Sequence, residues 1–173
     1  IALTGNFDDC QKFVKSMFAD KKFSSLTNLS GVNSINWSRI VVQIIYYFFS
    51  YFVISKKNSK TNFSVPTGNF GDIYAGYIAK KMGLPINKLL IATNENDILK
   101  RVLKTGLYKP LKVKHTVSPS MDIQVASNFE RLIFDICSCN PERTSKLMND
   151  LKELGEFKLA KDELSKILNN FCS

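Results

Sequence analysis

The sequence predicts an α/β fold, a three-layer structure in which helices flank a mostly parallel, twisted β-sheet. The first observation is that β-type segments alternate with segments of helical periodicity through residues 1–103, as in βαβ units. The second is that residues 37–54 form a long helical segment that is apolar nearly all round. We expect such a helix to be covered by other elements on more than one side.

Residues 1–36 predict a strand, a helix and a connection. Residues 1–4 have the apolar composition of a strand, and because the chain begins on this run without Met, we expect a fragment. Residues 27–35 carry Gly, Asn and Ser around a few apolar side chains, which favours a connection or a short strand. Residues 8–20 predict an amphipathic helix, with apolar positions at helical spacing: Phe13, Val14, Met17 and Phe18.

Two strand–helix units follow the long apolar helix. The predicted strands are residues 63–66 and 89–93, and the predicted helices are residues 72–82 and 95–103. Gly83 stands in the C-cap position of the first helix, and the second ends near Gly106. This alternation predicts a parallel sheet with helices on both faces.

The pattern changes after these units. Residues 109–122 contain two prolines and predict a loop. Ser127 begins a helix with a capping-box signature, because Glu130 lies three residues further on. Residues 141–173 predict two charged helices separated near Gly155.

Composition and charge argue against nucleic acid, membrane and metal as partners. The net charge of +9 invites nucleic-acid binding, but the lysines are scattered in short pairs without the aromatic pattern of an RNA-binding sheet. The uncharged run over residues 40–55 contains Gln43 and is shorter than the roughly 20 residues of a bilayer-spanning helix. The four cysteines show no zinc-type pairing, so no metal site is predicted.

The segment "SVPTGNFGDIYAG", residues 64–76, leads from a strand through a Gly-rich turn into a helix. Glycines let backbone N–H groups converge, and a helix N-terminus favours an anion. The turn lacks the Gly-Lys-Ser/Thr ending of a P-loop, which suggests a phosphate that stays bound. A purely structural turn is the alternative interpretation. Asp72 would repel a phosphate unless its side chain turns away to cap the helix.

A second polar cluster precedes the long apolar helix. Asn36 is its predicted N-cap, which puts Asn33 and Ser34 just outside the helix and Arg39 in its first turn. An amide, a hydroxyl and a guanidinium at one helix N-terminus would suit a phosphate ester. The alternative is a capped core helix with one surface arginine.

Five segments together resemble the threonine synthases, which are pyridoxal-phosphate enzymes of the tryptophan-synthase-β fold type (fold type II). They are "GNFDDCQ" (residues 5–11), "VNSINWSRIVVQIIYYF" (32–48), "SVPTGNFGDIYAG" (64–76), "ATNENDILKR" (92–101) and "SPSMDIQVASNFERL" (118–132). The match runs in order from about Gly5 to Leu132 and is loose beyond Cys139. Members of the family convert O-phospho-L-homoserine and water into L-threonine and phosphate.

The resemblance implies roles for particular residues. The positions that match the loop holding the 5′-phosphate of pyridoxal 5′-phosphate are Gly68, Asn69, Phe70, Gly71 and Asp72. The positions that match the grip on the substrate phosphate are Asn33, Ser34 and Arg39, with Asn69 beside them. The Schiff-base lysine is expected upstream, so the chain itself holds no catalytic residue and is expected to be inactive alone.

The resemblance also implies a domain organisation. Residues 1–32 match the end of a small domain, and residues 33–173 match part of a large cofactor-binding domain with a helical tail, so the sheet is expected to be incomplete. Two alternatives stay open: a threonine-synthase-like phospholyase, and a non-catalytic paralogue that binds pyridoxal phosphate or a phosphorylated metabolite. We expect a cytoplasmic protein whose exposed apolar surface promotes self-association.

Overall fold

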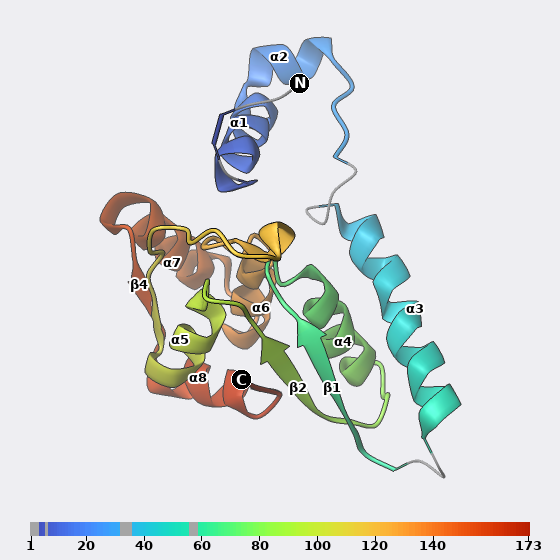
Figure 1. Ribbon diagram of the computed structural model, residues 1–173. Helices are drawn as coiled ribbons and strands as arrows, with labels where there is room; N and C mark the ends of the chain where they lie inside the picture. Colours follow the sequence, from blue (N-terminus) through green and yellow to red (C-terminus); the bar gives the residue numbers. More distant parts are fainter. Residues whose placement is uncertain (1–3, 6, 32–35, 56–58) are drawn as a thin grey trace.

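The structure, a computed structural model, describes residues 4–5, 7–31, 36–55 and 59–173. Helix α1 (Phe7–Ala19) confirms the helix predicted over residues 8–20. A short helix, α2 (Lys21–Leu26), follows because Asp20 caps it, its Oδ1 accepting the Lys22 N–H at 2.9 Å. Figure 1 shows α1 and α2 set apart from the α/β body.

Two predictions for residues 1–36 fall largely outside the described residues. The predicted strand over residues 1–4 includes only one described residue, Thr4, which lies in a bend. Of the predicted connection, residues 27–31 are described and have no regular secondary structure.

The central sheet has three parallel strands in the order β1–β2–β5. Strands β1 (Thr61–Pro66) and β2 (Ile86–Ala92) confirm the strands predicted over residues 63–66 and 89–93. Helix α4 (Gly71–Lys81) connects them, which makes the predicted βαβ unit. The prediction of a parallel sheet flanked by helices is therefore confirmed (Figure 1).

The C-terminal part contains more than the two helices predicted over residues 141–173. Helix α7 (Pro141–Leu154) does end at Gly155, which has a φ of 76°. The chain then forms β4 (Phe157–Lys158), α8 (Lys161–Leu168) and β5 (Phe171–Cys172). Strand β5 pairs with β2, with Phe171 opposite Leu89, so the tail completes the sheet of the first half.

The middle of the chain corrects two predicted helix starts. Helix α5 (Ile98–Thr105) begins three residues later than predicted, and Gly106 ends it with a φ of 73°. Helix α6 (Phe129–Ile136) begins after Asn128, so the capping box predicted for Ser127 and Glu130 is wrong. The remaining elements are β3 (Leu107–Tyr108), which pairs with β4, and a 3₁₀ turn (Pro119–Met121).

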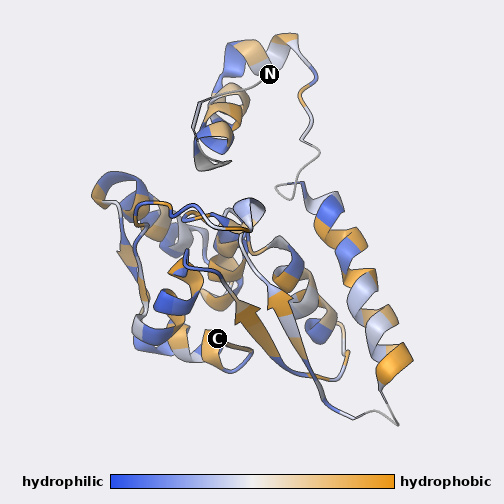
Figure 2. Cartoon of the chain, in the orientation of Figure 1, coloured by the Kyte–Doolittle hydropathy of each residue, from blue (hydrophilic) through white to orange (hydrophobic). Residues whose placement is uncertain are grey.

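Helix α3 (Trp37–Ile54) packs on α4 along one side only. The buried side chains are Ile40, Ile44, Tyr47 and Tyr51. Figure 2 shows hydrophobic residues on the rest of α3 as well, and these are exposed: Val41, Val42, Ile45, Tyr46, Phe49, Phe52, Val53 and Ile54. The prediction that other elements cover α3 on more than one side is therefore wrong for the described part of the chain. By length and composition alone, this 18-residue helix could also cross a membrane.

The exposed side of α3 predicts self-association. Phe49 and Phe52 are 70% and 71% exposed, and an apolar surface of this kind is buried when two copies meet. We expect the apparent mass in sedimentation velocity to rise above 19.6 kDa with concentration. Replacing both phenylalanines with lysine should restore a concentration-independent monomer. A wild-type chain that stays monomeric at all concentrations would contradict this expectation.

Candidate phosphate-binding site

The Gly-rich turn lies at the carboxyl end of the sheet. The Thr67 N–H donates to the Ala92 carbonyl at 2.8 Å, and Thr67 Oγ1 donates to the Val65 carbonyl at 2.6 Å. These bonds tie the turn to the ends of both β1 and β2. Because α4 begins at Gly71, the turn also forms the N-terminus of that helix. This is the edge at which open α/β sheets bind ligands.

The backbone of the turn presents unused donors. Phe70 has a φ of 67°, a left-handed conformation that costs a non-glycine residue roughly 1–3 kcal/mol. Its buried ring packs on Phe129 at 5.2 Å and on Phe171 at 5.5 Å between ring centroids, which holds this conformation in place. Within the described part of the chain, the N–H groups of residues 68–73 donate to no protein acceptor. They form an anion cradle.

The carboxylate of Asp72 is directed away from the cradle. Tyr47 Oη donates to Asp72 Oδ1 at 3.1 Å and to the Asp72 carbonyl at 2.9 Å. The side chain therefore turns away, as the anion interpretation requires, but it bonds to α3 and does not cap α4. Burial raises the pKa of Asp72 above its ordinary value, although the bond from Tyr47 opposes this. Burial and the neighbouring carboxylate likewise raise the pKa of Tyr47.

Residues 119–123 cover the turn. A Cβ added to Gly68 would lie 2.9 Å from Ile123 Cδ1 and 3.4 Å from Met121 Cε. Glycine at position 68 therefore lets this segment approach the backbone of the turn.

A buried polar network holds the covering segment. Asp122 accepts bonds from Thr116 Oγ1 at 2.7 Å, from Asn94 Nδ2 at 2.8 Å and from Asn96 Nδ2 at 3.1 Å. The hydrogen bond from Thr116 comes first among the causes that lower the pKa of Asp122. The network thereby connects the end of β2 to the loop over residues 109–124.

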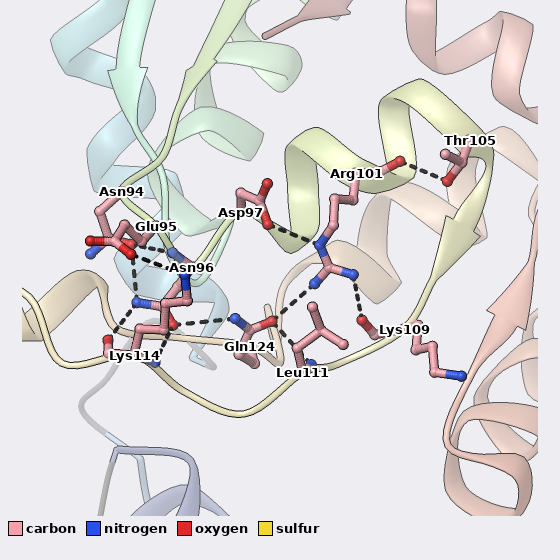
Figure 3. Close-up of polar contacts among 10 residues, drawn as sticks. All are labelled: Asn94, Glu95, Asn96, Asp97, Arg101, Thr105, Lys109, Leu111, Lys114 and Gln124. Atoms are coloured by element: carbon pink, nitrogen blue, oxygen red, sulfur yellow. Dashed lines mark hydrogen bonds and ion pairs between the residues drawn. The ribbon is translucent and has the colours of Figure 1, made fainter.

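Figure 3 shows how the network continues through Arg101. Its guanidinium donates to Asp97 Oδ1 at 2.9 Å, to the Lys109 carbonyl at 2.9 Å and to Gln124 Oε1 at 3.1 Å. Gln124 Nε2 in turn donates to Asn96 Oδ1 at 3.2 Å. The sequence suggested no role for these side chains, although Asn96, Asp97, Arg101 and Gln124 lie in two of the five segments that carry the resemblance.

The predicted substrate-phosphate residues are described only in part. Asn33 and Ser34 lie outside the described residues. Asn36 is confirmed as the N-cap of α3, with Oδ1 accepting the Ser38 N–H at 2.9 Å, and Arg39 is exposed in the first helical turn. Asn69 is partly buried, and its Oδ1 has no hydrogen-bond partner among the described residues.

The start of α3 lies beside α4 and α6. The Trp37 and Tyr74 rings meet edge to face at 6.4 Å, and the Arg131 guanidinium lies over the Trp37 ring at 5.5 Å. Among the described residues, no group of three or more His, Cys, Asp or Glu side chains could hold a metal ion.

Comparisons with known proteins give consistent relatives, although no protein-family model matches the chain. The threonine synthase of Saccharomyces cerevisiae is 48% identical over 185 residues, which cover 100% of this chain and 36% of the relative. The threonine synthase of Pseudomonas aeruginosa is 50% identical over 156 residues, which cover 90% of this chain and 33% of the relative. The chain thus spans about a third of the length of the curated relatives it matches.

Solved structures that resemble this chain are also threonine synthases. The pyridoxal-phosphate-bound threonine synthase from Brucella melitensis has a TM-score of 0.86 and 52% identity, and the match covers 97% of this chain and 36% of that one. The yeast threonine synthase structure has a TM-score of 0.86 and 48% identity, covering 100% of this chain and 36% of that one. The similarity therefore continues through the C-terminal tail, where the sequence resemblance was expected to be loose.

Proposed function

Because the chain is homologous over its whole length to part of the threonine synthases, we propose that it supplies the phosphate-binding turn of such an enzyme. The proposed reaction converts O-phospho-L-homoserine and water into L-threonine and phosphate, with pyridoxal 5′-phosphate as the cofactor. The observation that carries the proposal is the cradle over residues 68–73, whose backbone N–H groups have no acceptor among the residues that the structure describes.

The residues present fit the 5′-phosphate of the cofactor. Gly68, Asn69, Phe70 and Gly71 would hold it through backbone donors at the positive end of the α4 dipole. The Asp72 carboxylate does not compete, since it is bonded to Tyr47. When bound, the cofactor supplies a pyridine ring that delocalises the negative charge of carbanions.

The substrate phosphate would be held by Asn33, Ser34 and Arg39, with Asn69 beside them. A guanidinium and neutral donors stabilise the charge that develops on the leaving phosphate. Arg39 is exposed in the first turn of α3.

Other parts of the proposal concern the whole enzyme. We propose that residues 1–32 end a small domain and that residues 33–173 belong to a large cofactor domain. The separation of α1 and α2 from the α/β body supports this division (Figure 1). We place the Schiff-base lysine outside the chain and the enzyme in the cytoplasm, acting on a small molecule.

The proposed function is tested first on the reaction. The enzyme that includes this chain should release phosphate from O-phospho-L-homoserine and form an equal amount of threonine when pyridoxal phosphate is present. Release of phosphate without threonine would identify a phospholyase. Absence of release under cofactor saturation would refute both activities.

Replacing Gly68 with valine tests the cradle itself. The Cβ alone would lie 2.9 Å from Ile123 Cδ1, so the covering segment must move and the turn must distort. We expect at least a tenfold loss of affinity, about 1.4 kcal/mol, for 4′-deoxypyridoxine 5′-phosphate. This probe keeps the phosphate but has no aldehyde to react with surface lysines. Quenching of Trp37, the one tryptophan in the sequence, measures its binding.

The matched control for this substitution is Ser145→Val, on an exposed position of α7. It should bind the probe like the wild type. Equal affinity of Gly68→Val and wild type would show that the phosphate does not sit on this turn.

A further inference from the structure

Two polar side chains at the start of α6 each have a buried atom without a hydrogen-bond partner in the described structure. They are Ser127, whose Oγ has no hydrogen-bond partner, and Asn128, whose Nδ2 has none. A buried polar atom without a partner costs roughly 1–3 kcal/mol. Such atoms are rare in native proteins and often indicate a ligand or an ion.

Asn128 lies against the phosphate-binding turn, and Ser127 immediately precedes it in the chain. The Asn128 N–H donates to the Asn69 carbonyl at 3.0 Å. The neighbouring Phe129 ring packs on the Phe70 ring at 5.2 Å between centroids. The N-terminus of α6 is therefore adjacent to the N-terminus of α4.

The amide of Asn128 is held in one orientation. Its side chain is 1% exposed, and its Oδ1 accepts a bond from Arg131 Nε at 3.0 Å. This leaves Nδ2 as the unused donor. Asn128 occupies the N-cap position of α6, yet its side chain caps no N–H of the helix. The side chain thus contributes neither a cap nor a second internal bond through Nδ2.

Apart from the Asn69 amide, the cradle lacks side-chain donors of its own. It contains no lysine, and the cradle N–H groups belong to the backbone. A phosphate monoester has three acceptor oxygens, and bonds from neutral donors to such a charged group are stronger than bonds between neutral groups. Ser127 Oγ and Asn128 Nδ2 offer one O–H and one N–H donor at the adjoining helix start.

We propose that Ser127 and Asn128 complete the phosphate site at the turn, as side-chain ligands of the bound phosphate monoester. This inference rests on the proposed function, since it assumes a phosphate on the cradle. The third buried atom without a partner, Asn69 Oδ1, is an acceptor and would not bind a phosphate oxygen. Only the two donors are therefore assigned to the phosphate.

The test compares two near-isosteric substitutions. Ser127→Ala removes only the hydroxyl. Asn128→Asp keeps the acceptor for Arg131 but replaces the donor with a second carboxylate oxygen. Each variant should bind 4′-deoxypyridoxine 5′-phosphate at least about tenfold more weakly than the wild type. Inorganic phosphate should need a correspondingly higher concentration to compete. Ser127→Ala should also keep the wild-type melting temperature.

Two controls match these substitutions on exposed positions of α7: Ser145→Ala and Asn149→Asp. Both should bind the probe like the wild type. If Gly68→Val weakens binding but Ser127→Ala and Asn128→Asp do not, the inference is overturned and the proposed function stands. If the wild type binds neither the probe nor phosphate, the proposed phosphate site is refuted, and the inference with it. If Asn128→Asp does not fold, the probe affinity of Ser127→Ala alone tests the inference.

Discussion

Replacing Gly76 with valine is expected to destabilise the chain by about 3 kcal/mol or more, because no space exists for a side chain there. An added Cβ would lie 2.5 Å from Tyr47 Cε1, 2.7 Å from Tyr47 Cζ and 3.0 Å from Leu89 Cδ2. Contacts this short do not occur in packed proteins, so α3 would have to move away from α4.

The Tyr47 ring cannot move away from the added side chain without losing other stabilising contacts. Its hydroxyl is bonded to Asp72, and its ring meets Phe63 edge to face at 5.1 Å. The gain in helix propensity on replacing glycine is at most about 1 kcal/mol, which is smaller than the cost of overpacking. We therefore expect Gly76→Ala to be destabilising too, by about 1–2 kcal/mol.

Urea unfolding followed by circular dichroism measures these effects. Ala160→Val adds apolar volume at an exposed position before α8 and should change stability by less than about 0.5 kcal/mol. Combining Gly76→Val with Tyr47→Ala should cost less than the sum of the single changes, since the second removes the ring that the first meets. Wild-type stability of Gly76→Val would mean that α3 does not dock on α4 as described.

The local features of the fold were predictable from the sequence because neighbouring residues determine them. Glycine, strand and helix patterns around the turn gave β1 and α4 within two residues of their observed starts. Strand β5 was not predictable in this way. Its two residues are a strand because Phe171 pairs with Leu89, far away in the sequence, and strand propensity depends strongly on such context.

The two displaced helix starts have the same kind of cause. Asn94 and Asn96 lie on either side of residue 95, where the helix was predicted to begin. Both side chains are bonded to Asp122, and these bonds keep the backbone before α5 in the polar network. Ser127 was predicted to begin α6. The helix starts after Asn128 instead, because the Asn128 N–H is bonded to the Asn69 carbonyl of the turn. Local capping rules cannot anticipate bonds to distant residues.

The candidate site was predicted in its residues but not in its geometry. The sequence identified the turn and the possible repulsion by Asp72. It did not show that the carboxylate bonds to Tyr47, 25 residues earlier in the chain. Nor did it show that the left-handed position is Phe70, since the neighbouring glycines are the usual residues for a positive φ. The buried contacts of the Phe70 ring determine that choice.

Stability should depend on pH through Glu163, which connects α8 to α7. Its side chain is 8% exposed; Oε1 pairs with Arg143 Nε at 2.8 Å, and Oε2 accepts bonds from Arg143 at 2.9 Å and from the Ala160 N–H at 2.7 Å. The Cys137 thiol also donates to Oε1, and burial raises the pKa of that thiol to about 11. The hydrogen bonds from Arg143 lower the pKa of Glu163 from 4.5 to about 2.

The sign of the effect follows from this lowered pKa. Because the folded state holds the proton less tightly than the unfolded state, the stabilisation is complete above pH 4.5 and is lost as the pH falls towards 2. Glu163→Gln should therefore cost about 2–3 kcal/mol at pH 7, since it leaves the Arg143 guanidinium without its carboxylate. The difference from wild type should shrink below pH 4.5, because the unfolded wild-type chain then takes up a proton at Glu163 while the folded chain does so only near pH 2.

Urea unfolding at pH 7, 4.5 and 3 would measure this convergence. Glu153→Gln, on an exposed position of the same helix pair, is the control and should change stability little at any of the three values. A Glu163→Gln deficit that stays constant from pH 7 to pH 3 would assign the loss to packing and not to the ion pair. Because α8 leads directly into β5, loss of the pair at low pH should also release Phe171 from β2. That release removes one of the two rings that hold Phe70 in its left-handed conformation, so phosphate binding at the turn should weaken as the pH approaches 2, where the folded chain takes up the proton at Glu163.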